Sequence, residues 1–130
     1  MTLIEQEHLG GVCLNKGCIP SKALLRSADV ARLAREELGD LGVRVEYQGV
    51  DWGVVQKRKD RVVSQLVKGV AFLMKSSNVR VVMGTGRLVD GRTISVDTGG
   101  AEEVVTADRI ILAAGFNYGS IQANPANQRV

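Results

Sequence analysis

Apolar and polar residues alternate along the first half of the chain with periods that predict one short strand and two helices. Residues 2–5 form an apolar run typical of a buried strand, and a glycine-containing loop follows. From about residue 14 to residue 38, apolar side chains recur at helical spacing, until Gly39 and Gly42 end the pattern. Asp51 is a candidate N-cap for a second amphipathic helix that extends to about Ser76.

The second half of the chain has the pattern of a strand-rich segment. Strands are predicted at residues 79–83, in a hairpin over 87–96, near 103–106, and at 109–113. We expect the strands at 2–5, 79–83 and 109–113 to lie in or near one central sheet, with both helices packed on it. The fold class is therefore α/β. Residues 116–130 are rich in Asn, Gln, Gly and Ala without a period, and are predicted to form an irregular tail.

Composition and charge narrow the picture further. A chain of 130 residues with 45% hydrophobic residues is long enough for one globular domain. The net charge of +3 arises from interspersed signs, which argues against a nucleic-acid partner. The densest basic run, residues 57–61, is interpreted as a solvated helix face. No apolar run is long enough to cross a membrane, and no secretory signal is recognisable, so a cytoplasmic protein is predicted.

The candidate chemistry lies in two cysteines, Cys13 and Cys18, near the start of the first predicted helix. In a reducing compartment such a pair is more often catalytic than structural. The helix N-terminus, together with Lys16 and Lys22, favours thiolates over thiols. From spacing alone, a redox pair and a pair of inert packed thiols both remain possible. A structural zinc site would need about four ligands, and His8 is the only histidine in the sequence.

The longer string Gly-Gly-Val-Cys-Leu-Asn-Lys-Gly-Cys-Ile-Pro-Ser-Lys-Ala-Leu-Leu, residues 10–25, decides between these possibilities. It closely resembles the active-site segment of the class I pyridine nucleotide-disulfide oxidoreductases, and the resemblance extends over residues 1 to about 115. The ending Ile-Pro-Ser-Lys-Ala-Leu-Leu is most like the members that oxidise dihydrolipoamide. The resemblance implies a partial Rossmann-like FAD-binding domain with two helices and a β-hairpin, followed by the tail at 116–130.

The family's functional residues carry over to this sequence as follows. Cys13 would be the thiol that exchanges with the substrate, and Cys18 the thiolate that lies against the flavin. The remaining matched positions are implied to bind the cofactor, with Lys22 near the reactive flavin nitrogen, Glu5 on the adenosine ribose, and Gly86 at the adenine end. These cofactor positions are Glu5, Gly11, Val12, Lys22, Gly86, Ala114 and Gly115. Many relatives carry Thr at the position of Ala114, and Thr is also frequent at the position of Val12.

The resemblance also implies parts that this sequence lacks. The family's first strand with its Gly-x-Gly-x-x-Gly turn would precede Met1, and an NAD domain, a central domain and a dimerisation domain would follow Gly115. His8 is in the wrong context to replace the family's acid–base histidine. The sequence is therefore interpreted as a fragment of a homodimeric flavoenzyme that oxidises dihydrolipoamide on lipoyl domains, using FAD and NAD+. The chain alone is expected to be inactive.

Two alternatives stay open. One is another reductase of the family, acting on glutathione, mercuric ion or coenzyme A disulfide. The other is a non-enzymatic thiol-redox module.

Overall fold

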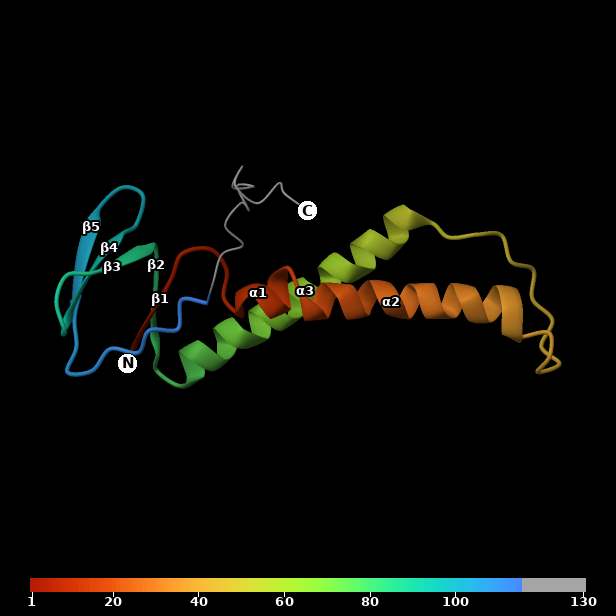
Figure 1. The fold of residues 1–130 in the computed structure, drawn as a ribbon, viewed down its shortest axis with the longest axis horizontal. Coiled ribbons are helices and arrows are strands. Elements are labelled where there is room, and N and C mark those ends of the chain that lie inside the picture. The colour runs from red at the N-terminus through yellow and green to blue at the C-terminus, as the bar shows by residue number, and fades with distance from the viewer. Residues whose placement is uncertain (116–130) are drawn as a thin grey trace, which may run out of the picture.

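The computed structural model describes residues 1–115, which form two crossed helices with two small sheets at one end (Figure 1). The helices and the π-helical turn η1 follow the first strand, and four more strands follow the last helix. In chain order the elements are β1 (Thr2–Glu5), α1 (Gly11–Asn15), α2 (Cys18–Arg32), η1 (Leu33–Glu37), α3 (Trp52–Ser76), β2 (Arg80–Met83), β3 (Thr85–Leu88), β4 (Thr93–Asp97) and β5 (Glu102–Thr106). This order confirms a mixed α/β fold. The predicted tail at 116–130 lies outside the described residues.

The first sheet consists of β1 and β2, which pair in parallel from Thr2↔Arg80 to Glu5↔Met83. The predicted strands at 2–5 and 79–83 are therefore confirmed as members of one sheet, and the structure shows that they are direct neighbours. A parallel pair needs a long crossover connection, and the three helices provide it. Val82 of β2 is one of three buried hydrophobic side chains among the described residues.

The second sheet is the antiparallel meander β3–β4–β5, which contains the predicted hairpin. Its turn is closed by the carboxylate of Asp90, which accepts a hydrogen bond from the backbone N–H of Arg92 at 2.7 Å. Val96 of β4 is completely buried. A Cβ atom on Gly84, between β2 and β3, would lie 2.4 Å from the carbonyl oxygen of Asp97. Only glycine therefore lets the chain pass from one sheet directly into the other at this point.

The predicted strand at residues 109–113 is wrong, because these residues form no strand. Ile111 and Leu112 are 87% and 76% exposed. A strand needs a neighbour for its backbone groups. Within residues 1–115 the parallel sheet consists of β1 and β2 alone, and residues 109–113 pair with neither of them.

The first predicted helix, 14–38, differs from the structure at both ends. It is interrupted at Gly17, whose φ of −122° and ψ of −113° are not helical. The helix α1 ends where the N–H of Lys16 donates to the carbonyl of Val12 at 2.8 Å. After Arg32 the backbone widens into η1, where the N–H of Leu38 donates to the carbonyl of Leu33 at 3.1 Å. Residues 43–50, which connect this helical stretch to α3, form no strand.

The second predicted helix is confirmed at both ends as α3. The side chain of Asp51 accepts a hydrogen bond from the N–H of Val54 at 3.0 Å, which is the expected N-cap. The helix ends at Ser76, and Asn78 has a positive φ of 54°. None of the helices in residues 1–115 has both the length and the hydrophobicity that spanning a membrane requires.

The helices pack mainly against one another, which corrects the expectation that both of them cover a central sheet. Both α1 and α2 contact α3, and α3 contacts β2 where the two elements adjoin. A 25-residue helix is about 37 Å long, whereas a four-residue strand is about 13 Å long. The parallel sheet is therefore too small to cover these helices, and much of the helical hairpin extends away from it (Figure 1).

Candidate redox site

The two cysteines lie on different helices that meet at a sharp turn. Cys13 is in α1, and Cys18 is the first residue of α2, with Lys16 and Gly17 between the helices. Both thiols are free and exposed. Because the helix is interrupted, Cys13 lies on the short helix α1 and Cys18 lies on the longer helix α2.

Gly17 makes this turn possible. A Cβ atom on Gly17 would lie 3.2 Å from the Cα of Cys13 and 3.2 Å from the carbonyl oxygen of Val12. Both are backbone atoms, which cannot move aside as a flexible side chain can. The carbonyl of Gly17 also accepts hydrogen bonds from the N–H of Ser21 at 3.1 Å and from its hydroxyl at 2.8 Å, so it starts α2. Sequence analysis assigned Gly17 no role of its own; the available signal was a glycine directly before the second cysteine.

The two thiols differ in their electrostatic surroundings. Hydrogen bonding from the Cys18 thiol lowers the pKa of Cys13, and the backbone N–H of Cys18 and the charge of Lys22 lower it further. The same interaction raises the pKa of Cys18, because a thiolate at Cys13 disfavours a second negative charge beside it. Cys13 is therefore the first of the pair to ionise, and it is the better nucleophile near neutral pH.

Lys22 lies one turn into α2, on the side of the helix that faces the thiols. The positive charge of Lys22 lowers the pKa of both cysteines. For Cys13, this effect is smaller than that of the hydrogen bonding from Cys18. Lys22 is therefore close enough to both cysteines to influence their ionisation.

The loop before α1 is held by Asn15, a residue that sequence analysis missed. Its side-chain amide donates to the carbonyl of Leu9 at 3.0 Å and to that of Gly11 at 2.9 Å. Lys16 forms an exposed ion pair with Glu7, which also lowers the pKa of Glu7. These contacts fix the loop against the helix that carries Cys13. No sequence signal distinguishes Asn15, because an asparagine in a helix is ordinarily a surface residue.

Glu5 lies at the carboxyl end of β1, beside the parallel pair. Its carboxylate accepts the N–H of Glu7 at 2.9 Å, and its carbonyl accepts the N–H of Gly84 at 2.9 Å. Gly86 lies in β3, close to the side chains of Ile4 in β1 and Ile94 in β4. A Cβ atom on Gly86 would lie 3.2 Å from a side-chain atom of Ile4 and 3.4 Å from one of Ile94.

The other predicted cofactor residues are open to solvent. Val12 is exposed, and a Cβ on Gly11 would meet no atom within 4 Å. Ala114 and Gly115 are exposed at the end of the described residues, and Gly115 has a φ of 66°. Among residues 1–115, no hydrogen bond connects Ala114 or Gly115 to the cysteines or to Glu5.

The described residues fit part of a flavin nucleotide. Glu5 presents a carboxylate acceptor of the kind that binds ribose hydroxyls, Gly11 leaves its backbone accessible, and Lys22 places a cation beside the thiols. No Gly-x-Gly-x-x-Gly turn occurs within residues 1–115. These residues therefore offer the ribose and thiol sides of such a site and not its pyrophosphate side. They also contain no cluster of three or more residues able to hold a metal ion.

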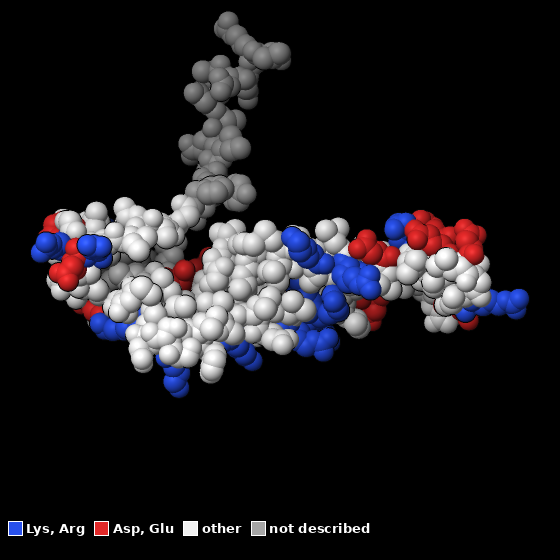
Figure 2. All heavy atoms as spheres, turned by 90° about the horizontal axis from the view of Figure 1, so that it is seen from below, with Lys and Arg blue, Asp and Glu red and all other residues white. Residues whose placement is uncertain are grey.

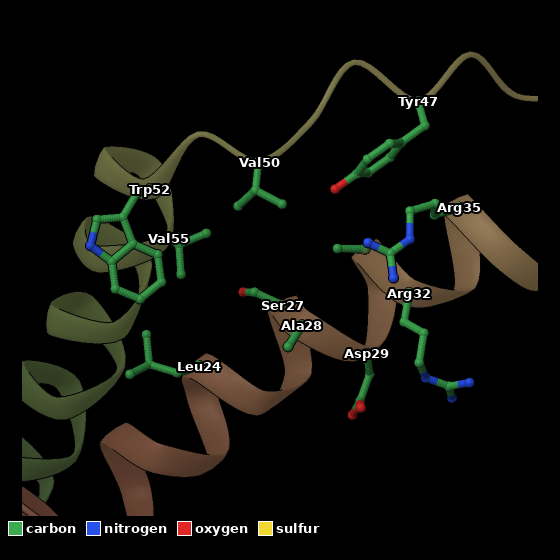
Figure 3. A pocket seen from close by; sticks show the side chains of 11 residues that line it. Leu24, Ser27, Ala28, Asp29, Arg32, Arg35, Tyr47, Val50, Trp52 and Val55 are labelled. Carbon is green, nitrogen blue, oxygen red and sulfur yellow. The ribbon is translucent and has the colours of Figure 1, made fainter.

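A hollow of about 450 Å³ lies away from the thiols, between α2 and the segment that leads into α3 (Figure 3). Its walls include Leu24, Tyr47 and Trp52, and it is mostly apolar. The guanidinium groups of Arg32 and Arg35 at its edge already form ion pairs with neighbouring glutamates. Nothing in this hollow is chemically suited to redox work, so the site remains at the cysteines.

The fold and this site together define a class of protein. The chain belongs to the pyridine nucleotide-disulphide oxidoreductase family, whose model matches residues 1–126. A dihydrolipoyl dehydrogenase of Bacillus subtilis is 43% identical over 122 residues, which cover 87% of this chain and 26% of the relative. The mitochondrial dihydrolipoyl dehydrogenase of Pisum sativum is 41% identical over 122 residues, 92% of this chain and 24% of the relative. A leghemoglobin reductase of Vigna unguiculata is 40% identical over 122 residues, with 92% and 23% covered. The chain thus spans about a quarter of the length of these relatives.

Proposed function

We propose that Cys13 and Cys18 alternate between a dithiol and a disulfide, as the redox centre of an FAD-dependent disulfide oxidoreductase. The observation that carries this proposal is the turn at Lys16 and Gly17, which brings α2 with Cys18 at its start directly after α1 with Cys13, while both thiols are free and exposed. A short loop that brings two thiols together lowers the entropic cost of closing the disulfide ring.

The exchange chemistry follows from the asymmetry of the pair. In the oxidised protein, a thiolate of a dithiol substrate attacks the sulfur of Cys13, the Cys13–Cys18 bond breaks, and Cys18 leaves as a thiolate. The second substrate thiol loses its proton and attacks the substrate sulfur of this mixed disulfide. The product is a substrate disulfide, and Cys13 leaves as a thiolate. The substrate has lost two electrons and two protons. The two electrons remain on Cys13 and Cys18, and the two thiolates take up the two protons to give the dithiol. Once the Cys18 thiolate has taken up a proton, its thiol again lowers the pKa of Cys13, which makes the Cys13 thiolate a good leaving group in the second step.

The substrate that best fits this proposal is dihydrolipoamide. Support comes from the relatives named dihydrolipoyl dehydrogenase, at about 40% identity. By resemblance, the partners of the whole protein would be lipoyl domains and a second copy of the chain, and NAD+ would bind outside residues 1–115. A second candidate is a reductase with another substrate, since a relative named leghemoglobin reductase is 40% identical as well.

We further propose that residues 1–115 supply part of an FAD-binding domain. Glu5 would bind the ribose, Gly11 and Val12 would lie against the cofactor, and Lys22 would face the ring. Gly86 would lie at the adenine end, with Ala114 and Gly115 at the second flavin motif. When bound, FAD supplies the two-electron acceptor for the dithiol.

The test of the redox proposal is to equilibrate the chain in glutathione buffers, alkylate the free thiols and measure the products by mass spectrometry. We expect a reversible two-electron transition that joins Cys13 to Cys18, and no such transition in Cys13→Ser or Cys18→Ser. Thiols that stay reduced and unpaired at every glutathione ratio would exclude the redox role. In the same preparation, FAD should bind weakly or not at all, and no NADH should form from dihydrolipoamide. Measurable turnover by this chain would contradict the partial-domain assignment.

A further inference from the structure

Arg58 departs from the prediction that the basic run at residues 57–61 is a solvated helix face, as does its half-buried neighbour Lys59. Figure 2 shows lysine and arginine side chains along the helical hairpin, with acidic side chains near its far end. Lys57 and Arg61 are exposed, as expected. Arg58 is half-buried, and its Nη1 donates a hydrogen bond to the carbonyl oxygen of Ala23 at 2.9 Å. One arginine of the run is therefore turned inward, across the contact between α3 and α2.

The acceptor of this hydrogen bond lies close to the redox site. Ala23 follows Lys22 directly and comes about one turn and a half after Cys18. With 7% exposure, Ala23 is one of three buried hydrophobic side chains in residues 1–115. The first turns of α2, which carry Cys18, are thus attached to α3 at this point.

The helix α3 also contacts α1, which carries Cys13. Each cysteine therefore lies on a helix that packs against α3, and α3 acts as their common support (Figure 1). The position of Cys18 relative to Cys13 depends on how firmly α1 and α2 are held to it. The backbone between them is a turn around Gly17, which by itself constrains the pair weakly because glycine has wide conformational freedom.

We propose that Arg58 is a positioning residue for the Cys13–Cys18 pair. This inference rests on the proposed redox function. Through the Ala23 carbonyl, its guanidinium holds the start of α2 in the orientation in which Cys18 faces Cys13. A charged donor in a partly buried contact forms a stronger hydrogen bond than a neutral donor at the surface. Arg58 touches neither sulfur, so its effect is on geometry and not on the exchange chemistry itself.

The measurable quantity is the equilibrium with glutathione. In that reaction the two protein thiols and one glutathione disulfide give the protein disulfide and two reduced glutathione molecules. Losing the hydrogen bond lets the start of α2 move, so closing the disulfide ring costs more entropy. We expect Arg58→Met to lower this equilibrium constant about three- to tenfold, the range that the net contribution of an ordinary hydrogen bond corresponds to. Methionine retains the apolar part of the side chain and removes the donors.

A second readout separates positioning from general stability. The pKa of Cys13 is lowered chiefly by donors on Cys18, so poorer alignment should move the pH profile of Cys13 alkylation to higher pH. Arg61→Met is the matched control, because it makes the same exchange on the same helix at an exposed position. Arg58→Lys keeps a charged donor with a different geometry. Its equilibrium constant and its alkylation profile should therefore lie between those of Arg58→Met and of the unmodified chain.

The outcomes distinguish this inference from the redox proposal. If the unmodified chain forms no reversible disulfide, the redox function fails, and the inference fails with it. If the unmodified chain forms the disulfide and Arg58→Met matches Arg61→Met in both readouts, the positioning role alone is overturned. Helix content is checked by circular dichroism. Should Arg58→Met lose its helices, Arg58→Gln is measured instead, and an equilibrium constant equal to that of Arg61→Met would overturn the inference.

Discussion

The pKa values of Cys13 and Cys18 shift in opposite directions because the two cysteines occupy different positions on their helices. Cys13 accepts from the thiol and the backbone N–H of Cys18, whereas Cys18 sits beside a sulfur that ionises before it. The order of ionisation is thus set by which sulfur receives the donors. In disulfide exchange, this order decides which sulfur attacks and leaves most readily.

The first prediction concerns the pH dependence of Cys13. A lowered pKa means that the thiolate is fully formed at a lower pH, so alkylation should reach its maximum rate at a lower pH than for an ordinary thiol. Cys18→Ala removes the largest cause of the shift and should move the Cys13 profile to higher pH. Lys22→Met should move it in the same direction by less. The measurement is the rate of iodoacetamide labelling against pH, followed by mass spectrometry.

Lys68→Met is the control for this experiment, since it removes an exposed lysine from α3. It should leave the profile where it is in the unmodified chain. An unchanged profile in Cys18→Ala would show that the Cys18 donors do not stabilise the thiolate.

At the residue scale, the sequence was informative where function depends on neighbours in the chain. Cys13, Cys18 and Lys22 fall within one short string, so their proximity could be predicted. The contact of Arg58 with Ala23 could not, because it joins residues on separate helices and depends on how those helices cross. The role of Gly17 could not either, because it depends on a backbone angle that the sequence does not specify.

Among the elements, α3 was predictable because its signals are local. A capping aspartate and a long amphipathic period mark its limits. The start of α2 was less predictable, since the apolar period runs across the interruption at Gly17. The strand expected at residues 109–113 depends on a partner strand, which a local pattern does not reveal.

The second prediction tests the N-cap of α3. Asp51→Ala removes the acceptor for the N–H of Val54 and should lower the free energy of unfolding by about 1 kcal/mol. Asp51→Asn retains an acceptor oxygen and should be nearly neutral. Urea unfolding followed by circular dichroism measures both. Equal stability of Asp51→Ala and the unmodified chain would mean that the cap contributes nothing to α3.

The molecule as a whole leaves large hydrophobic side chains exposed on its helices. Leu25 on α2 and Phe72 on α3 are 60% and 69% exposed, and only three hydrophobic residues of 1–115 are buried. The prediction that both helices cover a sheet was wrong. The hydrophobic pattern of a helix shows which face is apolar, and it does not show which part of the molecule packs against that face. Exposed apolar surface of this kind favours association.

The third prediction is that the chain associates with increasing concentration through these side chains. Phe72→Asp should shift the association to higher concentration without lowering stability, because Phe72 makes little buried contact. Ser64→Asp adds the same charge at an exposed position of α3 and is the matched control. Sedimentation velocity over a range of concentrations measures both. An equal shift in the two variants would assign the effect to charge and not to apolar surface.

The parallel pairing of β1 with β2 has a consequence for the order in which the chain folds. Thr2 pairs with Arg80, so the whole helical hairpin lies between the two strands. Closing so long a loop in an unstructured chain is entropically costly, whereas helices and their hairpin contacts form locally and quickly. We therefore expect folding to proceed from the helices to the sheet. The turn that joins Cys13 and Cys18 lies within the part that forms first, so the thiol pair is assembled before the strands close.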